Sequence, residues 1–524
     1  MKTFIKYLGI IALLTGVFTA CSDDELDTNP TDKVSGATIF QDEAAAQTAV
    51  DGCYYLLYQG VFVTSNANHA EGHQSTIMAL DLMGDDMVIT NLTNWYGMDY
   101  TYYYTNTLGS GQVGTASRSY NIWNMMYTLI SNVNYILAQD GNLGQNGSEA
   151  KNILAQAYAL RAFAYFELIQ GFQKTYIGNQ TAPGVPVYTE PTLAGDEGKS
   201  RGTVEEVYTQ INADIAKAID LFAEVGKPAQ KHSSYIDYYV AKGLEARINM
   251  VQGKWQEAYN AATEARSRSG NRLLNASEIV SGMNDKGLPS SIWCMEVITE
   301  QAPIYYYYLD PKGTNGGLNQ RKCISSWLYG KIARYDDARL KWFKDGTQGS
   351  ATTGENVNYG QMKFMYKDIV TWEGDIIFMR AEEMLLIQAE AKARLGAFAD
   401  TRNLLNNLAA VRLASTTARD NYASYLNNLA DNNSIPELTT VDPTNVLEEV
   451  LIQKRIELWC EYGRLKDILR LKQTFDRRYE GSNHLDFLAN VKIRPESGAF
   501  LFKIPQREFD GNKNILHTEQ NPID

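Results

Sequence analysis

The sequence lacks the features that metalloenzymes, disulfide-rich proteins and many hydrolases require. Its 524 residues include only five cysteines and five histidines, without the Cys-x-x-Cys or mixed Cys/His spacing of a metal site. A chain of this length does not need disulfides, so we expect buried free thiols, with a Cys294–Cys323 bridge as the alternative. No Walker loop and no G-x-S-x-G sequence is present, which disfavours nucleotide hydrolysis and serine-hydrolase chemistry.

The chain also has fewer basic than acidic residues. The chain has 48 Lys and Arg against 61 Asp and Glu, a net charge of −13. This balance disfavours nucleic acid as a partner, because binding to phosphates needs clustered Lys and Arg. The apolar fraction of 44% and the charged fraction of 21% are those of a folded globular protein. The length predicts one large multi-lobed domain or two merged ones.

The N-terminus has the order of a secretory signal. Two lysines, an apolar run too short to span a bilayer and small residues precede Cys21, an arrangement that resembles a bacterial lipobox. Acyl chains on Cys21 would tether the protein stably, and the acidic stretch Ser22–Glu25 resembles a tag for the outer face of the outer membrane. We expect a signal peptide at 1–20, a lipidated tether at 21–35 and a single domain at 36–524. An ordinary secreted protein is the alternative.

Helical periodicity recurs along the chain. Apolar residues at steps of three and four predict helices over 44–58, 119–137, 152–172 and 203–221. The last of these opens with Thr203 and, three residues on, Glu206, which is the order of a capping box.

Two later segments look like copies of each other. Predicted helices at 240–251 and 378–395 each end at a glycine, Gly253 or Gly396, which favours a left-handed cap. An aromatic residue two positions later, Trp255 or Phe398, begins the partner helix, at 255–266 or 398–412. These are helix hairpins of tetratricopeptide type, although the strict consensus of that repeat is absent. We predict a mostly α-helical fold in which such pairs stack into one curved scaffold.

Two blocks have little periodicity and many aromatic residues. They cover about 83–115 and 270–375, with short strands expected near 291–299 and 361–369. Irregular stretches of this length are usually functional. We therefore expect the ligand face in these blocks.

Several motifs together resemble the SusD/RagB-like lipoproteins of outer-membrane glycan uptake systems. The resemblance runs over nearly the whole chain, and its strongest motif is KRIELWCEYGRLKDILR at 454–470. The other motifs are WNMMYTLISNVNYIL at 123–137, LAQAYALRAFAYFEL at 154–168, GVPV at 184–187, RGTVEEVYTQINADIAKA at 201–218, MRAEEMLLIQAEAKA at 379–393 and FKIPQRE at 502–508.

The resemblance implies tetratricopeptide-like helix pairs that support a loop-rich ligand face with a few short strands. It also implies a glycan-binding lid on a SusC-like TonB-dependent transporter, without catalytic residues and without a cofactor. Two alternatives stay open at this point. The protein could capture peptides for such a transporter, or it could be a structural transporter subunit without its own ligand.

Aromatic residues in the irregular blocks are the candidates for ligand contact. Sugar rings present flat C–H faces edged by hydroxyls, so they need aromatic planes beside polar side chains. Four consecutive tyrosines at 305–308 cannot all face one core, because neighbours in a strand point to opposite sides. The alternative is that these rings pack against neighbouring loops. The predicted ligand-binding residues are Trp95, Tyr96, Tyr100, Tyr306, Trp327 and Tyr329.

Three groups of polar residues could suggest metal or acid–base chemistry. His69 and His73 have helical spacing, but Gly72 weakens a helix there and no third zinc ligand is evident. Gly84 among three aspartates at 81, 85 and 86 indicates a solvated turn rather than a calcium site. Glu457 and Glu461 share a helix face with arginines beside them, which predicts a salt-bridge network. We therefore predict no metal and no enzymatic activity.

Overall fold

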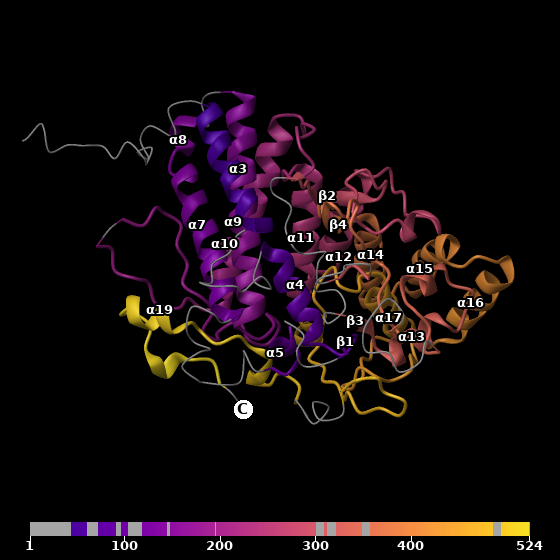
Figure 1. The fold of residues 1–524 in the computed structure, drawn as a ribbon. Helices are drawn as coiled ribbons and strands as arrows, with labels where there is room; N and C mark the ends of the chain where they lie inside the picture. Colours follow the sequence, from indigo (N-terminus) through magenta and orange to yellow (C-terminus); the bar gives the residue numbers. More distant parts are fainter. Residues whose placement is uncertain are drawn as a thin grey trace, which may run out of the picture.

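The computed structural model describes residues 43–59, 72–90, 96–102, 118–143, 147–193, 195–299, 309–311, 321–347, 357–485 and 494–522. Over these ranges the protein is mostly helical with a few short strands, which confirms the predicted fold class (Figure 1). None of the helices in this part of the chain is long and apolar enough to cross a membrane.

The elements follow one another in a simple order. The helices are α3 (Glu43–Gln59), α4 (Gly72–Leu82), α5 (Gly97–Tyr100), α7 (Arg118–Leu137), α8 (Asp140–Leu143), α9 (Ser148–Phe172), α10 (Val204–Glu224), α11 (Tyr238–Gln252), α12 (Trp255–Ser267), α13 (Ser326–Ile332), α14 (Ala381–Arg394), α15 (Phe398–Arg412), α16 (Thr416–Asn428), α17 (Val446–Glu457), α18 (Arg464–Arg470) and α19 (Gln506–Gly511). The strands are β1 (Met87–Ile89), β2 (Ser291–Met295), β3 (Lys322–Ile324) and β4 (Ile376–Arg380).

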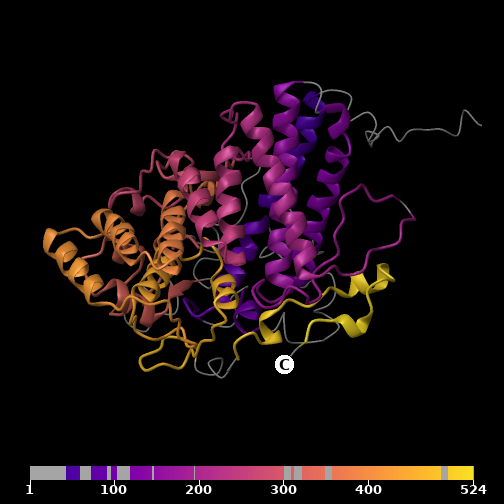
Figure 2. The ribbon, with the colours of Figure 1, turned by 180° about the vertical axis from the view of Figure 1, so that it is seen from behind.

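The long helices form one continuous array. From α7 through α9, α10, α11, α12, α14 and α15 to α16, each of these helices packs on the next, and α3 packs on α7 and α9. The tall helices α7, α9 and α10 stand at one side and the array steps down toward α15 and α16 (Figures 1 and 2). The predicted pairs α11/α12 and α14/α15 are both confirmed.

Local sequence signals set the ends of these helices. Gly253 and Gly396 have φ of 74° and 77°, in the left-handed region that glycine adopts without strain. At α10, Thr203 accepts a hydrogen bond from the Glu206 N–H while the Glu206 side chain bonds the Thr203 N–H, which confirms the capping box.

The strands correct two details of the prediction. β2 confirms the strand expected near 291, and it pairs in antiparallel fashion with β4. Because β4 extends to Arg380, α14 begins at Ala381, and the prediction of helix from residue 378 was wrong. Around 361–369 the chain makes isolated bridges, such as Phe343 with Gln361, rather than a strand. Short apolar runs such as 376–379 fit either structure, so periodicity could not decide between them.

A buried network of charges holds the 454–470 motif in place. Glu457 accepts hydrogen bonds from Arg339, Arg380 and Arg412, which confirms a salt-bridge network. The prediction was wrong in its details, because these arginines are distant in sequence and α17 ends at Glu457, so that Glu461 does not share its helix. A cluster this deep fixes the relative positions of the segments that carry it, because removing one partner would leave an unpaired buried charge.

The aspartates near Gly84 also belong to this interior. Asp85 pairs with Arg464 at 3.0 Å, and Asp86 pairs with Arg455 at 2.6 Å. All three aspartates are buried, so the prediction of a solvated turn was wrong. The partners lie almost 400 residues away in sequence, and a side chain at position 84 would clash with Arg464.

His73 and the four described cysteines are core residues. His73 is buried beside Glu167, and burial lowers its pKa to about 4, while His69 lies outside the described residues. Cys53, Cys294, Cys323 and Cys460 are buried free thiols, so the bridge considered as an alternative does not form. Within the described ranges, no group of three metal-ligating side chains comes together.

Candidate functional site

A group of partly buried aromatic residues surrounds α13. Trp327 and Tyr329 lie on this helix, Tyr359 comes from the segment after residue 357, and Tyr479 follows α18. We call these four residues the α13 surface. They combine the aromatic rings and nearby polar groups that a carbohydrate requires.

Hydrogen bonds from a helix cap and from the distant residue Asn483 position α13 at the end of β3. The Ser325 hydroxyl caps the helix by accepting a hydrogen bond from the Leu328 N–H. Asn483 accepts from the Ser326 N–H at 2.8 Å and donates to the Ile324 carbonyl at 3.0 Å. The strand, the helix start and the segment after Tyr479 are thereby held as one unit.

Trp327 lies against two cations. The Lys331 Nζ is 4.3 Å and the Arg455 guanidinium carbon 4.8 Å from its ring centroid. Lys331 is one helical turn further along α13 and also pairs with Asp442, and burial lowers its pKa. These contacts fix the indole while it stays partly exposed, so a ligand would meet a rigid ring.

Tyr329 is held by a second aromatic residue. Its ring and that of Tyr359 have centroids 5.2 Å apart at 65°, an edge-to-face arrangement. The Tyr359 carbonyl accepts a hydrogen bond from the Ile324 N–H at 3.0 Å, which ties this ring to β3. Trp327 and Tyr329 are therefore the two predicted ligand residues that the structure places on one surface.

Tyr96 and Tyr100 are core residues, and this corrects the expectation that they contact a ligand. Their exposed fractions are 1% and 0%. The Tyr100 hydroxyl lies 2.7 Å from His484 Nδ1, and the Arg477 guanidinium carbon is 4.1 Å from its ring centroid. Arg118 lies over the Tyr96 ring. A ring enclosed in this way has no free face for a sugar.

Arg477 explains why this cluster closes. Its guanidinium donates to the carbonyls of Leu82, Gly84 and Tyr100 and thereby attaches the end of α4, the turn after it and α5 to the chain after α18. No local sequence signal reveals a partner so distant. The other predicted residues, Trp95, Tyr306 and the lipidation site Cys21, lie outside the described residues and stay predictions.

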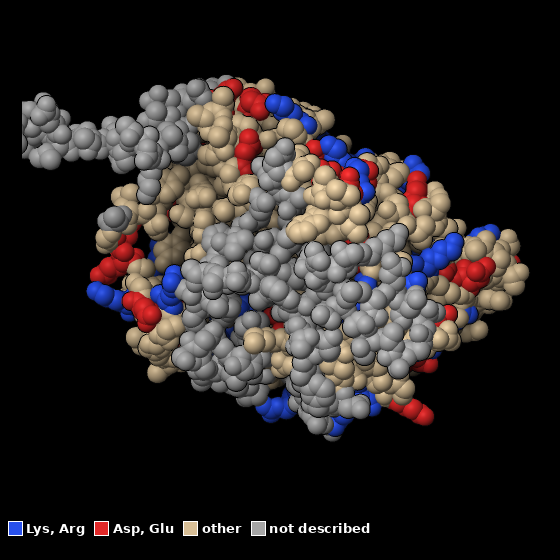
Figure 3. Space-filling model, viewed as in Figure 1, with Lys and Arg blue, Asp and Glu red and all other residues tan. Residues whose placement is uncertain are grey.

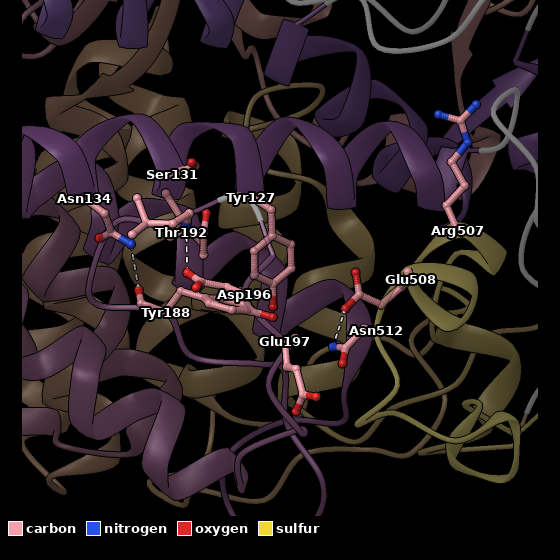
Figure 4. A pocket seen from close by; sticks show the side chains of 14 residues that line it. Tyr127, Ser131, Asn134, Tyr188, Thr192, Asp196, Glu197, Arg507, Glu508 and Asn512 are labelled. Carbon is pink, nitrogen blue, oxygen red and sulfur yellow. Dashed lines mark hydrogen bonds between the residues drawn. The ribbon is translucent and has the colours of Figure 1, made fainter. Parts of the chain in front are cut away.

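A cavity that sequence analysis missed lies between α7, the segment at 186–198 and α19. Its volume is about 310 Å³. Tyr127 and Asn134 of α7 extend toward Tyr188 and Asp196, while Arg507 points away from the other labelled side chains (Figure 4). The sequence feature that could have indicated this cavity is Tyr188, an aromatic residue that follows the GVPV motif in a long connecting segment. The lining side chains labelled there are Tyr127, Ser131, Asn134, Tyr188, Thr192, Asp196, Glu197, Arg507, Glu508 and Asn512.

Charged side chains are dispersed on the surface. On the face seen in Figure 3, lysines and arginines alternate with aspartates and glutamates over the described part, and neither sign forms a broad continuous patch there. A large charged ligand would find no extended complementary surface on this part of the face.

Comparison with known proteins identifies the family. The SusD family matches residues 230–523, and a related family described as starch-binding and associating with the outer membrane matches residues 36–238. This chain belongs to the SusD family.

Relatives of this SusD-family protein include SusD-like proteins P38 and P25 of Formosa agariphila. The first is 22% identical over 91% of this chain and 93% of its own length. The second is 25% identical over 56% of this chain and 52% of its own length.

Solved structures show the same fold. A SusD-like carbohydrate-binding protein from Bacteroides vulgatus superposes with a TM-score of 0.71 at 23% identity, covering 92% of this chain and 99% of that one. A laminarin-binding SusD-like protein superposes with a TM-score of 0.65 at 18% identity, covering 92% and 100%.

Proposed function

We propose that this SusD-family protein captures a glycan at the bacterial cell surface and delivers it to a SusC-like TonB-dependent transporter. The observation that carries the proposal is the α13 surface, where fixed aromatic rings stay accessible beside polar groups. Family membership supports carbohydrate as the ligand class, and the laminarin-binding structural neighbour makes a neutral β-glucan the first glycan to test.

The expected affinity is modest. Two or three rings that each bury roughly 60–100 Å² against sugar contribute about 3–7 kcal/mol at ~25 cal/mol/Å². Association itself costs several kcal/mol of this. The dissociation constant is therefore expected in the millimolar range. Weak capture suits a protein that must release its cargo to a transporter.

The proposed location rests on lipidation of Cys21. The 21 residues between Cys21 and Glu43 reach at most ~70 Å when fully extended, enough to join a membrane anchor to the folded domain. Replacing Cys21 by alanine should release the protein from the membrane fraction, and surface proteolysis of intact cells should digest the unaltered protein. A membrane-bound C21A variant would contradict the anchor.

Affinity electrophoresis through gels that contain laminarin, starch or other glycans tests the ligand directly. The protein without its signal and Cys21 should be retarded by at least one glycan, and Trp327→Ala should migrate faster in that gel. No retardation by any glycan, with peptide binding instead, would replace this proposal by a peptide-capturing role. If the protein binds neither glycans nor peptides, the result would favour a structural transporter subunit without its own ligand.

Delivery needs a separate test. The protein should copurify with a TonB-dependent transporter coexpressed from the neighbouring gene, and glycan uptake by cells should require both. Incubation with the retained glycan should give no smaller products, since we expect no turnover. Normal uptake without this protein would contradict its role in delivery.

A further inference from the structure

The cavity between α7 and α19 has two tyrosine rings set at a right angle. The rings of Tyr127 and Tyr188 have centroids 6.0 Å apart at 87°. Tyr127 donates a hydrogen bond to the Pro186 carbonyl at 2.8 Å, and the Tyr188 hydroxyl accepts one from the Lys199 N–H at 2.9 Å. Because both hydroxyls are engaged, the rings keep this corner open before any ligand enters.

Some polar groups of the cavity serve the fold. Asn134 donates to the Tyr188 carbonyl at 3.1 Å and thereby attaches the 186–198 segment to α7. Glu508 accepts from Trp123 Nε1 at 3.1 Å and from Asn512 at 2.7 Å, which attaches α19 to the same helix. The walls come from three separate segments, yet direct hydrogen bonds connect them.

Other polar groups remain available. The Ser131 and Thr192 hydroxyls and the Glu197 carboxylate make no hydrogen bond or ion pair with another residue that the structure describes. Asp196 uses one oxygen to accept from the Leu193 N–H at 2.7 Å and keeps the other. Hydroxyl and carboxylate groups thus line the cavity, with Asp196 next to the two tyrosine rings (Figure 4).

The volume of the cavity and the charge of its lining residues indicate which class of ligand it can bind. A volume of about 310 Å³ is at the lower end of the ~300–1,000 Å³ typical of ligand pockets, so it suits one or two sugar units rather than a chain. Carboxylates accept hydrogen bonds from pairs of sugar hydroxyls but repel uronate or sulfate groups. The α13 surface, in contrast, is an open face built from other elements.

We propose that the α7–α19 cavity, with the corner of Tyr127 and Tyr188 beside Ser131, Asp196 and Glu197, is a second carbohydrate-binding site that takes one end of a neutral glycan. The proposal extends the proposed function, because it adds an end-recognising pocket to an open glycan-binding surface. It assigns the cavity a ligand without requiring that the α13 surface bind the same sugar.

Saturation-transfer NMR with single sugars tests the cavity by itself. The probes are the neutral methyl glycosides of glucose, galactose and mannose, with methyl glucuronide as the acidic comparison. Ser131→Trp would fill the cavity from α7, and Asn132→Trp on the exposed side of the same helix is the matched control. Thermal unfolding of both variants checks that the fold is retained.

The expected result is a signal from at least one neutral glycoside that weakens about tenfold in S131W and persists in N132W. Methyl glucuronide should bind more weakly than that glycoside, and Glu197→Gln should reduce the difference. Equal signals in S131W and N132W, or no signal from any neutral glycoside, would overturn the second site. Retardation in the glycan gels would still uphold the proposed function in either case.

Discussion

Two aromatic regions flank the small β1–β3 sheet, and they differ in how far their rings are buried. β1 leads to α5, where Tyr96 and Tyr100 are enclosed, whereas β3 leads to α13, where Trp327 and Tyr329 stay partly exposed. Both regions have cations against their rings. The difference is that Arg477 also bonds three backbone carbonyls around Tyr100 and closes the space, while Lys331 beside Trp327 pairs with a surface aspartate.

The comparison shows that aromatic density alone does not identify a ligand site. Tyr100 is a core residue because a distant segment encloses it, whereas Trp327 stays partly exposed although Arg455, one of its two cations, is buried. Substitutions on the α5 side should therefore change stability, and substitutions on the α13 side should change binding.

The largest effect is expected for Tyr100→Ala. Truncating a fully buried aromatic ring creates a cavity and leaves His484 Nδ1 without its hydrogen-bond partner. The free energy of unfolding should fall by about 3–5 kcal/mol in urea titrations. The folded fraction should bind glycan as the unaltered protein does, and a loss below about 1 kcal/mol would contradict a core role.

His484 should make stability sensitive to acid. Burial, reinforced by the Arg477 charge, lowers its pKa to about 3 in the folded protein. Because the unfolded chain takes up this proton near pH 6.5, stability is complete above that pH and is lost as the pH falls toward 3. Between pH 7 and pH 4 the loss from this residue should be roughly 3 kcal/mol.

Urea titrations at several pH values measure this dependence. His484→Gln serves as the control, and its unfolding free energy should fall less steeply over the same interval. His73 adds a similar dependence, since its pKa is about 4, so the difference between H484Q and the unaltered protein is the relevant quantity. Identical slopes would mean that His484 does not stay neutral in the fold.

On the α13 side, Trp327→Ala should weaken glycan binding about tenfold or more, because the ring is fixed by two cations and stays partly exposed. The melting temperature should change little compared with Tyr100→Ala. Calorimetry and thermal unfolding of the same preparation measure both. A large loss of stability with unchanged affinity would place Trp327 with the core residues.

The smallest effect is expected for Tyr329. Its ring is edge-to-face with Tyr359, so Tyr329→Phe keeps the aromatic pair and should bind glycan within about twofold of the unaltered protein. Tyr329→Ala removes the ring and should weaken binding by a factor of about three to five. If Y329F is as weak as Y329A, the hydroxyl rather than the ring contacts the glycan.

Much of the scaffold could be predicted because its signals are local. The capping box at Thr203, the glycines at 253 and 396 and the apolar stripes of α7 and α9 each act within a few residues. The candidate site was harder, since burial of Tyr96 and Tyr100 depends on Arg477 and His484. The cavity at Tyr188 was missed for the same reason, because α19 supplies one wall from more than 300 residues away.

The most direct test of the account is calorimetric titration of the retained glycan into matched tryptophan variants. Trp372 is 40% exposed on the turn between Asp368 and Glu373, so Trp372→Ala removes an accessible tryptophan that is not one of the four residues of the α13 surface. The account predicts that W327A raises the dissociation constant about tenfold while W372A leaves it unchanged. Equal affinity of W327A and the unaltered protein would contradict glycan binding at the α13 surface.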